Sequence, residues 1–328
     1  MSAAPITRTI AATREALAAM PRPLGLVPTM GALHGGHLAL VATAARECAS
    51  VVVSVFVNPT QFGPDEDLGR YPRDEARDVA LASAAGAGLV FAPPAAEMYR
   101  PGAATTVHVE GPLATRYEAA ERPGHFDGVA TIVTKLLAIV APDRAYFGRK
   151  DAQQLAVVRR RVADLDLPVE IVAVATVREP DGLALSSRNV YLTVAQRAKA
   201  AELHRALLAG RSVADDGARA VVGEVTSRLG VGFPPHGADT DDPHGRHEPR
   251  FSVDYVAVVD PDHFTALDVL QPDDVAPESL IIAAARLGET RLLDNVAVGE
   301  TIGATTSRQT TTPHEPDPHG GPASDQED

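Results

Sequence analysis

Two histidines, His34 and His37, lie among glycines where an apolar run gives way to a helix-like stretch. The run Gly25–Pro28 predicts a strand, and residues from about His37 to Ala49 predict a helix. Glycine lets the backbone approach a phosphate closely, and a helix N-terminus offers unpaired N–H groups and positive potential to an anion. Residues three apart on a first helical turn face the same side. The pattern therefore predicts a polyphosphate site served by both imidazoles.

Other phosphate-binding patterns are absent from this stretch. Neither G-x-G-x-x-G nor G-x-x-x-x-G-K-[ST] occurs in it, so a dinucleotide site or a P-loop is disfavoured. For a single histidine, an ordinary turn residue or helix cap would be the preferred interpretation. The occurrence of two histidines together, after a strand and among glycines, favours a functional interpretation.

A second basic motif lies far downstream, at Leu185-Ser186-Ser187-Arg188-Asn189. Two hydroxyls and a guanidinium on one short loop suit a polyphosphate, because arginine can hold two oxygens in a fork. Alone, this motif would be a common exposed turn. Together with the histidine pair it indicates a nucleotide site.

Composition excludes several classes of function. The chain has 328 residues, 45% of them hydrophobic, and a formal net charge of -13. So acidic a chain is a poor nucleic-acid binder and is not expected on an anionic membrane surface. No apolar run resembles a signal peptide or a membrane span, so we expect a cytoplasmic protein. The single cysteine, Cys48, allows no internal disulfide and is expected in the core.

Strand-like and helix-like stretches alternate over residues 1–176, which predicts an α/β fold with a parallel sheet. Residues 177–302 predict a smaller α+β domain. An insert at about 234–250 and a tail at 303–328 have the composition of disordered segments. The expected elements are strands at 25–28, 51–57, 89–91, 144–147, 169–176, 252–259, 280–285 and 290–298, and helices at 37–49, 73–85, 127–140 (capped by Asp127), 152–164, 195–208 and 214–229.

The H-x-G-H arrangement resembles the nucleotidyltransferase superfamily, whose ATP signature is shared with class I aminoacyl-tRNA synthetases. Further stretches narrow the resemblance to the pantothenate synthetases, in order and spacing, from about Gly25 to Asn295. These stretches are Pro28–His34, Phe56–Phe62, Arg122–Val129, Phe147–Gln154 and Asp181–Asn189.

The resemblance implies ATP-dependent condensation of pantoate with β-alanine through an adenylate, with release of AMP and pyrophosphate. It implies a Rossmann-like nucleotide domain, a smaller domain that covers the site, Mg²⁺ and a homodimer. It assigns the main catalytic role to His37 and places Gln61 against both substrates and Gln154 against pantoate. Asn58, Arg122 and His125 match positions near the substrates. The implied ATP site comprises Met30, Gly31, Ala32, Leu33, His34, Gly35, Gly36, His37, Gly148, Arg149, Lys150, Asp151, Val177, Leu185, Ser186, Ser187 and Arg188.

The chemistry of an adenylate-forming step fits these residue types. Negative charge builds on the α-phosphoryl oxygens and on the departing pyrophosphate, so positioned cations and N–H donors are needed. The catalytic candidates are His34, His37, Lys150 and Arg188. Mg²⁺ would bridge phosphate oxygens and keep much of its water. Asp78 is a candidate metal contact.

Three positions depart from the pattern of the family. Gly35 stands where glutamate is usual, Arg149 where glutamate precedes the phosphate lysine, and Leu185 where methionine is usual. Gly35 is expected to change the start of the helix, whereas Leu185 has nearly the volume of the usual methionine. Arg149 would raise the local positive potential or point to solvent.

Other functions remain open at this point. A nucleotidyltransferase of the same superfamily would release pyrophosphate without needing β-alanine and would form no AMP. A non-catalytic ATP-binding protein is disfavoured by the intact His34, His37, Lys150 and Arg188. A tRNA synthetase is disfavoured by the acidic charge and by the absence of a recognisable anticodon-reading region.

Overall fold

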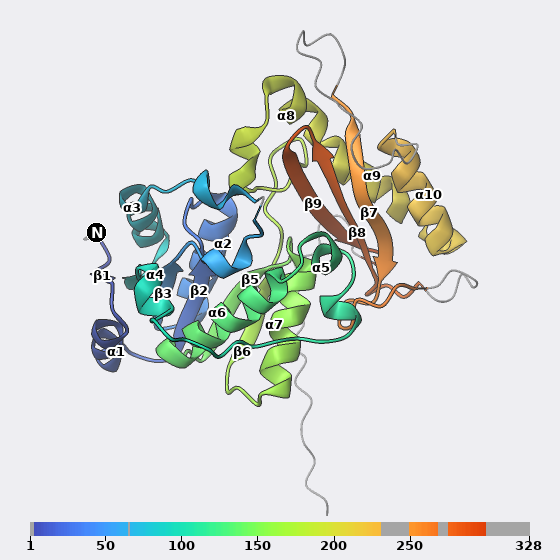
Figure 1. The fold of residues 1–328 in the computed structure, drawn as a ribbon. Coiled ribbons are helices and arrows are strands. Elements are labelled where there is room, and N and C mark those ends of the chain that lie inside the picture. The colour runs from blue at the N-terminus through green and yellow to red at the C-terminus, as the bar shows by residue number, and fades with distance from the viewer. Residues whose placement is uncertain (1–2, 65, 231–248, 268–274, 300–328) are drawn as a thin grey trace, which may run out of the picture.

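A computed structural model describes residues 3–64, 66–230, 249–267 and 275–299 (Figure 1). The tail expected at 303–328 lies outside the described residues. Residues 234–248 of the insert expected at 234–250 also lie outside them. Within the described ranges, none of the helices has the length and apolar character needed to cross a membrane.

The larger sheet is wholly parallel, as predicted. Its strands run in the order β1-β4-β3-β2-β5-β6. The chain forms β2, β3 and β4 in one direction, then returns past β2 to add β5 and β6 on the other side. The strands are β1 (Ile6–Thr7), β2 (Leu24–Thr29), β3 (Ser50–Val55), β4 (Leu89–Phe91), β5 (Arg144–Gly148) and β6 (Glu170–Val174).

The central strands are buried on both faces because their alternate side chains enter two different cores. On β3, Val52 faces one core while Val51 and Val53 face the other. On β4, Leu89 and Phe91 share the core of Val52, whereas Val90 points to the opposite side. A strand covered by helices on both faces has the sequence of a continuous apolar run, which is the pattern that identified it.

Helices cover the two faces of this sheet (Figure 1). Apolar residues of α1, α6 and α7 pack on one face, and those of α2 and α3 pack on the other. The elements are α1 (Ile10–Ala18), α2 (Gly35–Glu47), α3 (Glu75–Ala85), α4 (Ala95–Met98), α5 (Glu118–Glu121), α6 (His125–Val140) and α7 (Ala152–Asp164), with 3₁₀ turns η1 (Pro59–Gln61), η2 (Asp67–Gly69) and η3 (Pro112–Ala114).

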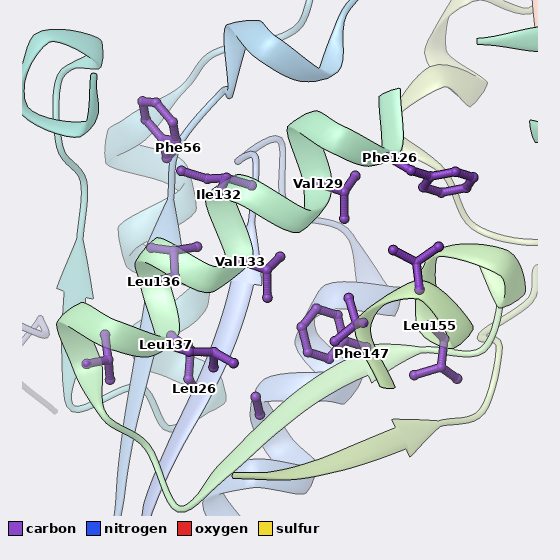
Figure 2. Packing of buried hydrophobic residues seen from close by; sticks show 14 of the residues in the cluster. Leu26, Phe56, Phe126, Val129, Ile132, Val133, Leu136, Leu137, Phe147 and Leu155 are labelled. Carbon is purple, nitrogen blue, oxygen red and sulfur yellow. The ribbon is translucent and has the colours of Figure 1, made fainter. Parts of the chain in front are cut away.

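Helix α6 is the most deeply buried of these helices, because it is enclosed by the sheet, α1 and α7. Figure 2 shows Val129, Val133 and Leu137 of α6 directed toward the sheet, with Leu26 and Phe147 beneath them. Each such side chain removed from water stabilises the fold by about 1.5–3 kcal/mol. This core fixes α6 against β2 and β5.

The smaller part has a three-stranded antiparallel sheet in the order β7-β8-β9, as the α+β prediction anticipated. Helices α9 and α10 pack together and contribute apolar residues to one core with this sheet. The boundary at residue 176 stays a prediction. The elements are α8 (Val194–Ala200), α9 (Glu202–Arg211), α10 (Ala218–Arg228), β7 (Phe251–Val259), β8 (Leu280–Leu287) and β9 (Thr290–Ala297), with η4 (Ser187–Tyr191) and η5 (Ala214–Asp216).

Two helix predictions were wrong in detail. The expected helix 195–208 is divided at Ala201 into α8 and α9. Asp127 does not cap α6: the cap position is Gly124, with φ +80°, and the Asp127 carboxylate lies 2.7 Å from Nδ1 of His108. Glycine tolerates the left-handed conformation there without strain, so the helix begins earlier.

The strand order places a switch point between β2 and β5. Ligands of open parallel sheets bind beyond the carboxyl ends of the strands at such a point. The histidine motif follows β2, η1 follows β3, and residues 149–151 follow β5. The sheet therefore gathers three predicted site segments at one edge.

Gly128 of α6 allows this helix to approach η1 closely. A Cβ at Gly128 would lie 2.2 Å from the carbonyl oxygen of Thr60. We expect Gly128→Ala to destabilise the protein by about 1–3 kcal/mol, since backbone must shift to relieve the overlap. The control is Gly223→Ala in α10, where a Cβ meets nothing within 4 Å. That change should be stabilising by about 0.5–1 kcal/mol. Thermal unfolding midpoints measure both, and equal midpoints would contradict the packing.

Candidate active site

The turn between β2 and α2 carries the histidine motif. Gly31 and Ala32 adopt left-handed φ values of +80° and +50°, which reverse the chain before His34. The His34 side chain caps α2, because its Nδ1 accepts a hydrogen bond from the Gly36 N–H at 3.1 Å. The turn is thus continuous with the helix N-terminus that the sequence predicted.

The proton positions of the two imidazoles follow from these bonds. Nδ1 of His37 accepts from the His34 N–H at 3.4 Å, which completes a reciprocal cap. A neutral imidazole carries one N–H, so an accepting Nδ1 leaves the proton on Nε2. The rings lie with their centroids 4.1 Å apart. Each ring can therefore offer an Nε2–H donor to a ligand.

Both histidines are neutral near pH 7. Burial, followed by the positive charge of Lys150, lowers the pKa of His34 to about 4. Burial, followed by the neighbouring His34, lowers the pKa of His37 to about 3. Of the two kinds of group that the chemistry requires, cations and N–H donors, the histidines therefore fit the N–H donors. Among the four predicted catalytic groups, the positive charge comes from Lys150 and Arg188.

Residues 149–151 form the turn that follows β5, whose last residue is Gly148. Nζ of Lys150 lies 3.7 Å from Oδ1 of Asp151. Asn295 of β9 holds this turn, because its Nδ2 donates to the carbonyls of Arg149 at 2.9 Å and Lys150 at 2.8 Å. The smaller part of the chain thus fixes the backbone that carries Lys150.

Asn58 orients Gln61. Nδ2 of Asn58 donates to the Gly128 carbonyl at 3.2 Å and to Oε1 of Gln61 at 3.0 Å, while its Oδ1 accepts from the Tyr99 hydroxyl at 2.7 Å. Asn58 is only 1% exposed. These hydrogen bonds all lie inside the protein, and its place near the substrates stays a prediction. The Nε2 group of Gln61 is left to donate to a ligand.

Arg122 and His125 form a connected pair beside Gln61. The guanidinium of Arg122 binds both carboxylate oxygens of Glu66, at 2.8 and 2.7 Å, and donates to Nε2 of His125 at 3.0 Å. Arginine can only donate, so Nδ1 of His125 carries the proton and donates to the Gln61 carbonyl at 2.9 Å. Burial, then the charge of Arg122, lowers the pKa of His125 to about 4.

The downstream motif returns to the same edge. Leu185 N–H binds the Val177 carbonyl at 3.0 Å, and the Ser187 hydroxyl lies 3.2 Å from that of Tyr71. Arg188 is held by both oxygens of Asp67, at 3.1 and 2.9 Å. Ser186 caps η4 through the Arg188 N–H. No sequence pattern indicated that Glu66 and Asp67 would neutralise the two arginines.

Two departures from the family pattern meet in space. A Cβ on Gly35 would lie 3.0 Å from Cδ1 of Leu185, so a larger residue there requires that leucine to shift. Burial lowers the pKa of Arg159 against the charge of Asp262, and the nearby charge of Arg149 lowers it further.

A pocket brings several predicted residues together between the two parts of the chain. Arg122, His125, Lys150, Asp151 and Gln154 line it. The histidine motif, Gln61 and residues 185–188 border the same edge without lining this pocket, and the Leu33 side chain belongs to the core at 1% exposure. Lining residues that the sequence analysis missed include Glu118, Tyr255 and Asp294.

Asp78, the candidate metal contact, directs both of its carboxylate oxygens at backbone N–H groups. Its two oxygens accept from the Ala32 N–H at 2.8 Å and the Leu33 N–H at 2.7 Å. In the described part of the chain, no group of three or more His, Cys, Asp or Glu residues could hold a metal ion. The same bonds engage the N–H groups of two residues that the family resemblance places in the ATP site.

The lowered histidine pKa values predict a pH dependence. The unfolded chain takes up protons near pH 6.5, whereas His34 and His37 in the folded chain do so only near pH 4 and 3. Stability should therefore fall as pH falls from about 6.5 toward about 4. His34→Asn keeps an effective helix cap without a titrating group, so its unfolding free energy should fall less steeply. Denaturant titrations at each pH test this, and equal slopes would contradict it.

Comparison with known proteins gives a consistent result. The sequence profile of the family described as Pantoate-beta-alanine ligase matches residues 5–297. A Pantothenate synthetase of Thermus thermophilus is 53% identical over 292 residues, which covers 89% of this chain and 99% of the relative. One from Acidothermus cellulolyticus is 50% identical over 291 residues, covering 89% and 90%.

Solved structures agree with the fold. The crystal structure of the Thermus thermophilus enzyme superposes with a TM-score of 0.79 at 50% identity, covering 89% of this chain and 99% of that one. The Pantoate-beta-alanine Ligase from Francisella tularensis, complexed with beta-gamma ATP and beta-alanine, gives a TM-score of 0.71 at 28% identity, covering 91% and 99%. The match extends over both sheets and every site segment described above, and the chain belongs to the pantoate–β-alanine ligase family.

Proposed function

We propose that this chain catalyses ATP-dependent condensation of pantoate with β-alanine, which gives pantothenate, AMP and pyrophosphate through a bound pantoyl adenylate. The observation that carries the proposal is the family match over residues 5–297, which includes both parts of the chain that build the site. The Francisella tularensis relative, whose complex contains beta-gamma ATP and beta-alanine, supports small-molecule substrates.

In the first step the pantoate carboxylate attacks the α-phosphorus of ATP. Lys150 and Arg188 supply positive charge for the triphosphate, and the Nε2–H groups of His34 and His37 donate to its oxygens. Because these donors are buried or held by caps, they need little reorganisation as charge develops. The ATP site is proposed to be lined by the turn from Met30 to His37, residues 148–151, Val177 and residues 185–188.

In the second step the β-alanine amine attacks the acyl carbon and AMP departs. The acyl adenylate is sensitive to water, so the site must be covered while it waits. Asn295, and the pairing of Arg291 with Glu118, hold the smaller part of the chain over the pocket. These two contacts are the observations that support a covering role for the smaller part of the chain.

Amide side chains suit pantoate, because its hydroxyls require both donors and acceptors. Gln154 lines the pocket, and Gln61 has its Nε2 group available as a donor. His125 and Arg122 support the backbone of Gln61, since both donate to its carbonyl. We propose direct substrate contacts for the two glutamines and supporting positions for Asn58, Arg122 and His125.

Mg²⁺ is proposed to enter with ATP. Mg²⁺ usually keeps several waters and binds phosphate oxygens with one or two carboxylates. Asp151 is the carboxylate that fits this requirement, because it lies beside Lys150 and its charge acts on both motif histidines. When bound, the ion would neutralise charge on the phosphates.

A homodimer and a cytoplasmic location are also proposed. The first is supported by the family resemblance and the second by the use of ATP as a substrate.

A coupled assay distinguishes the ligase from a nucleotidyltransferase. We expect ATP and pantoate to give AMP continuously only when β-alanine is present, and the amount of AMP should equal the amount of pantothenate. The reason is that the amine completes the second step and frees AMP. Release of pyrophosphate without amine-stimulated AMP would support the nucleotidyltransferase instead. Chromatographic quantification of AMP and pantothenate measures both outcomes.

His37→Ala should lower turnover by about two to four orders of magnitude, because a positioned donor to the phosphoryl oxygens is lost. The matched control is His263→Ala, whose exposed side chain lies near Asp260 and does not line the pocket. That variant should retain the wild-type rate. A wild-type rate for His37→Ala would remove this residue from the mechanism.

A further inference from the structure

We propose that Asp78 is a positioning residue whose carboxylate fixes the turn that carries His34 and His37. Asp78 lies on α3, a helix that contributes no predicted catalytic group. The kinetic test of this inference rests on the proposed function, whereas its spectroscopic test rests on the geometry of the turn alone.

The first observation is the geometry of the carboxylate. Asp78 is 1% exposed, and each of its oxygens accepts one backbone N–H, from Ala32 at 2.8 Å and Leu33 at 2.7 Å. Hydrogen bonds from N–H groups to a carboxylate are among the stronger ones. If the carboxylate were removed, two N–H groups would be left without this partner, at about 1–3 kcal/mol each where they are buried.

The second observation is the conformation that the carboxylate stabilises. Ala32 has φ +50°, a left-handed value that residues with a Cβ rarely adopt. Gly31 has φ +80°, and a Cβ there would lie 2.9 Å from Oδ2 of Asp78. The turn therefore needs glycine at position 31, and it needs a hydrogen-bond acceptor from outside the turn for the N–H groups of Ala32 and Leu33. Asp78 is that acceptor.

The third observation is what the turn carries. Leu33 is followed directly by His34, whose ring caps α2 and whose N–H binds His37. A shift of the Ala32 and Leu33 backbone would move the cap and, with it, both imidazoles. Misplacement of a catalytic group by about 1 Å can lower a rate about 100-fold.

Neighbouring contacts lock the turn from its other sides. The Gly31 N–H donates to Oγ1 of Thr29 at 3.2 Å, and Thr29 in turn donates to the Ser54 carbonyl at 2.6 Å. Arg77 donates to the Leu33 carbonyl at 3.2 Å. Arg77 also lies 4.0 Å from Asp78, at the limit of an ion pair. The carboxylate is thus held mainly by the backbone that it positions.

The test compares Asp78→Asn with Asp74→Asn. Asp74 caps α3 through the Arg77 N–H, and asparagine caps helices equally well. Asparagine at 78 has one acceptor atom where two N–H donors converge. We expect Asp78→Asn to lower kcat by about 10- to 100-fold and Asp74→Asn to leave it unchanged. Steady-state kinetics at saturating ATP and Mg²⁺, with folding checked by circular dichroism, measure this.

Two results would overturn the proposal. Recovery of wild-type kcat in Asp78→Asn at high Mg²⁺ would identify a metal contact. A variant with a lowered thermal midpoint but wild-type kcat below that midpoint would show a role in stability alone.

A readout without turnover separates this inference from the proposed function. Imidazole proton resonances of His34 and His37 should shift in Asp78→Asn and remain in place in Asp74→Asn. Unchanged resonances in both would refute the positioning role, whatever the enzyme's activity. If the resonances shift in Asp78→Asn and the wild-type protein makes no pantothenate, the positioning role is retained and the proposed function is refuted.

Discussion

The parallel pairing of β2 with β3 on one side and β5 on the other decides where everything else lies. Parallel strands present their carboxyl ends at one edge, so the segments that follow them must meet there. The histidine turn, η1 and the lysine turn are far apart in the sequence and become neighbours for this reason. The apolar side chains that bury the sheet on both faces supply the free energy that maintains the pairing.

The second constraint is electrostatic. Three cations of the candidate site have a carboxylate beside them: Glu66 binds Arg122, Asp67 binds Arg188, and Asp151 lies near Lys150. These pairs keep charge in the site compensated while no ligand is present. An incoming polyphosphate would compete with the carboxylates for the same cations, so its binding depends on the difference between two sets of ion pairs. The neutral histidines avoid this competition.

The smaller part of the chain supports two segments of the candidate site. Its β9 carries Asn295, which holds the lysine turn, and Arg291, which binds Glu118 just before the segment that bears Arg122. The Tyr255 hydroxyl on β7 binds the same Glu118 at 2.9 Å. These contacts link the smaller part of the chain to the two segments that line the pocket. A displacement of that part would therefore loosen the supports of Lys150 and Arg122 together.

The sequence by itself determined the parallel sheet, its strands other than the edge strand β1, the smaller α+β part and the identity of the motif residues. It could do so because alternating apolar patterns and short motifs are local properties of the chain. Only the tertiary structure decided that Asp78 binds the turn, that Asn58 orients Gln61, and that His34 and His37 are neutral. Hydrogen-bond partners and burial depend on residues brought together from distant segments, and no local pattern specifies them.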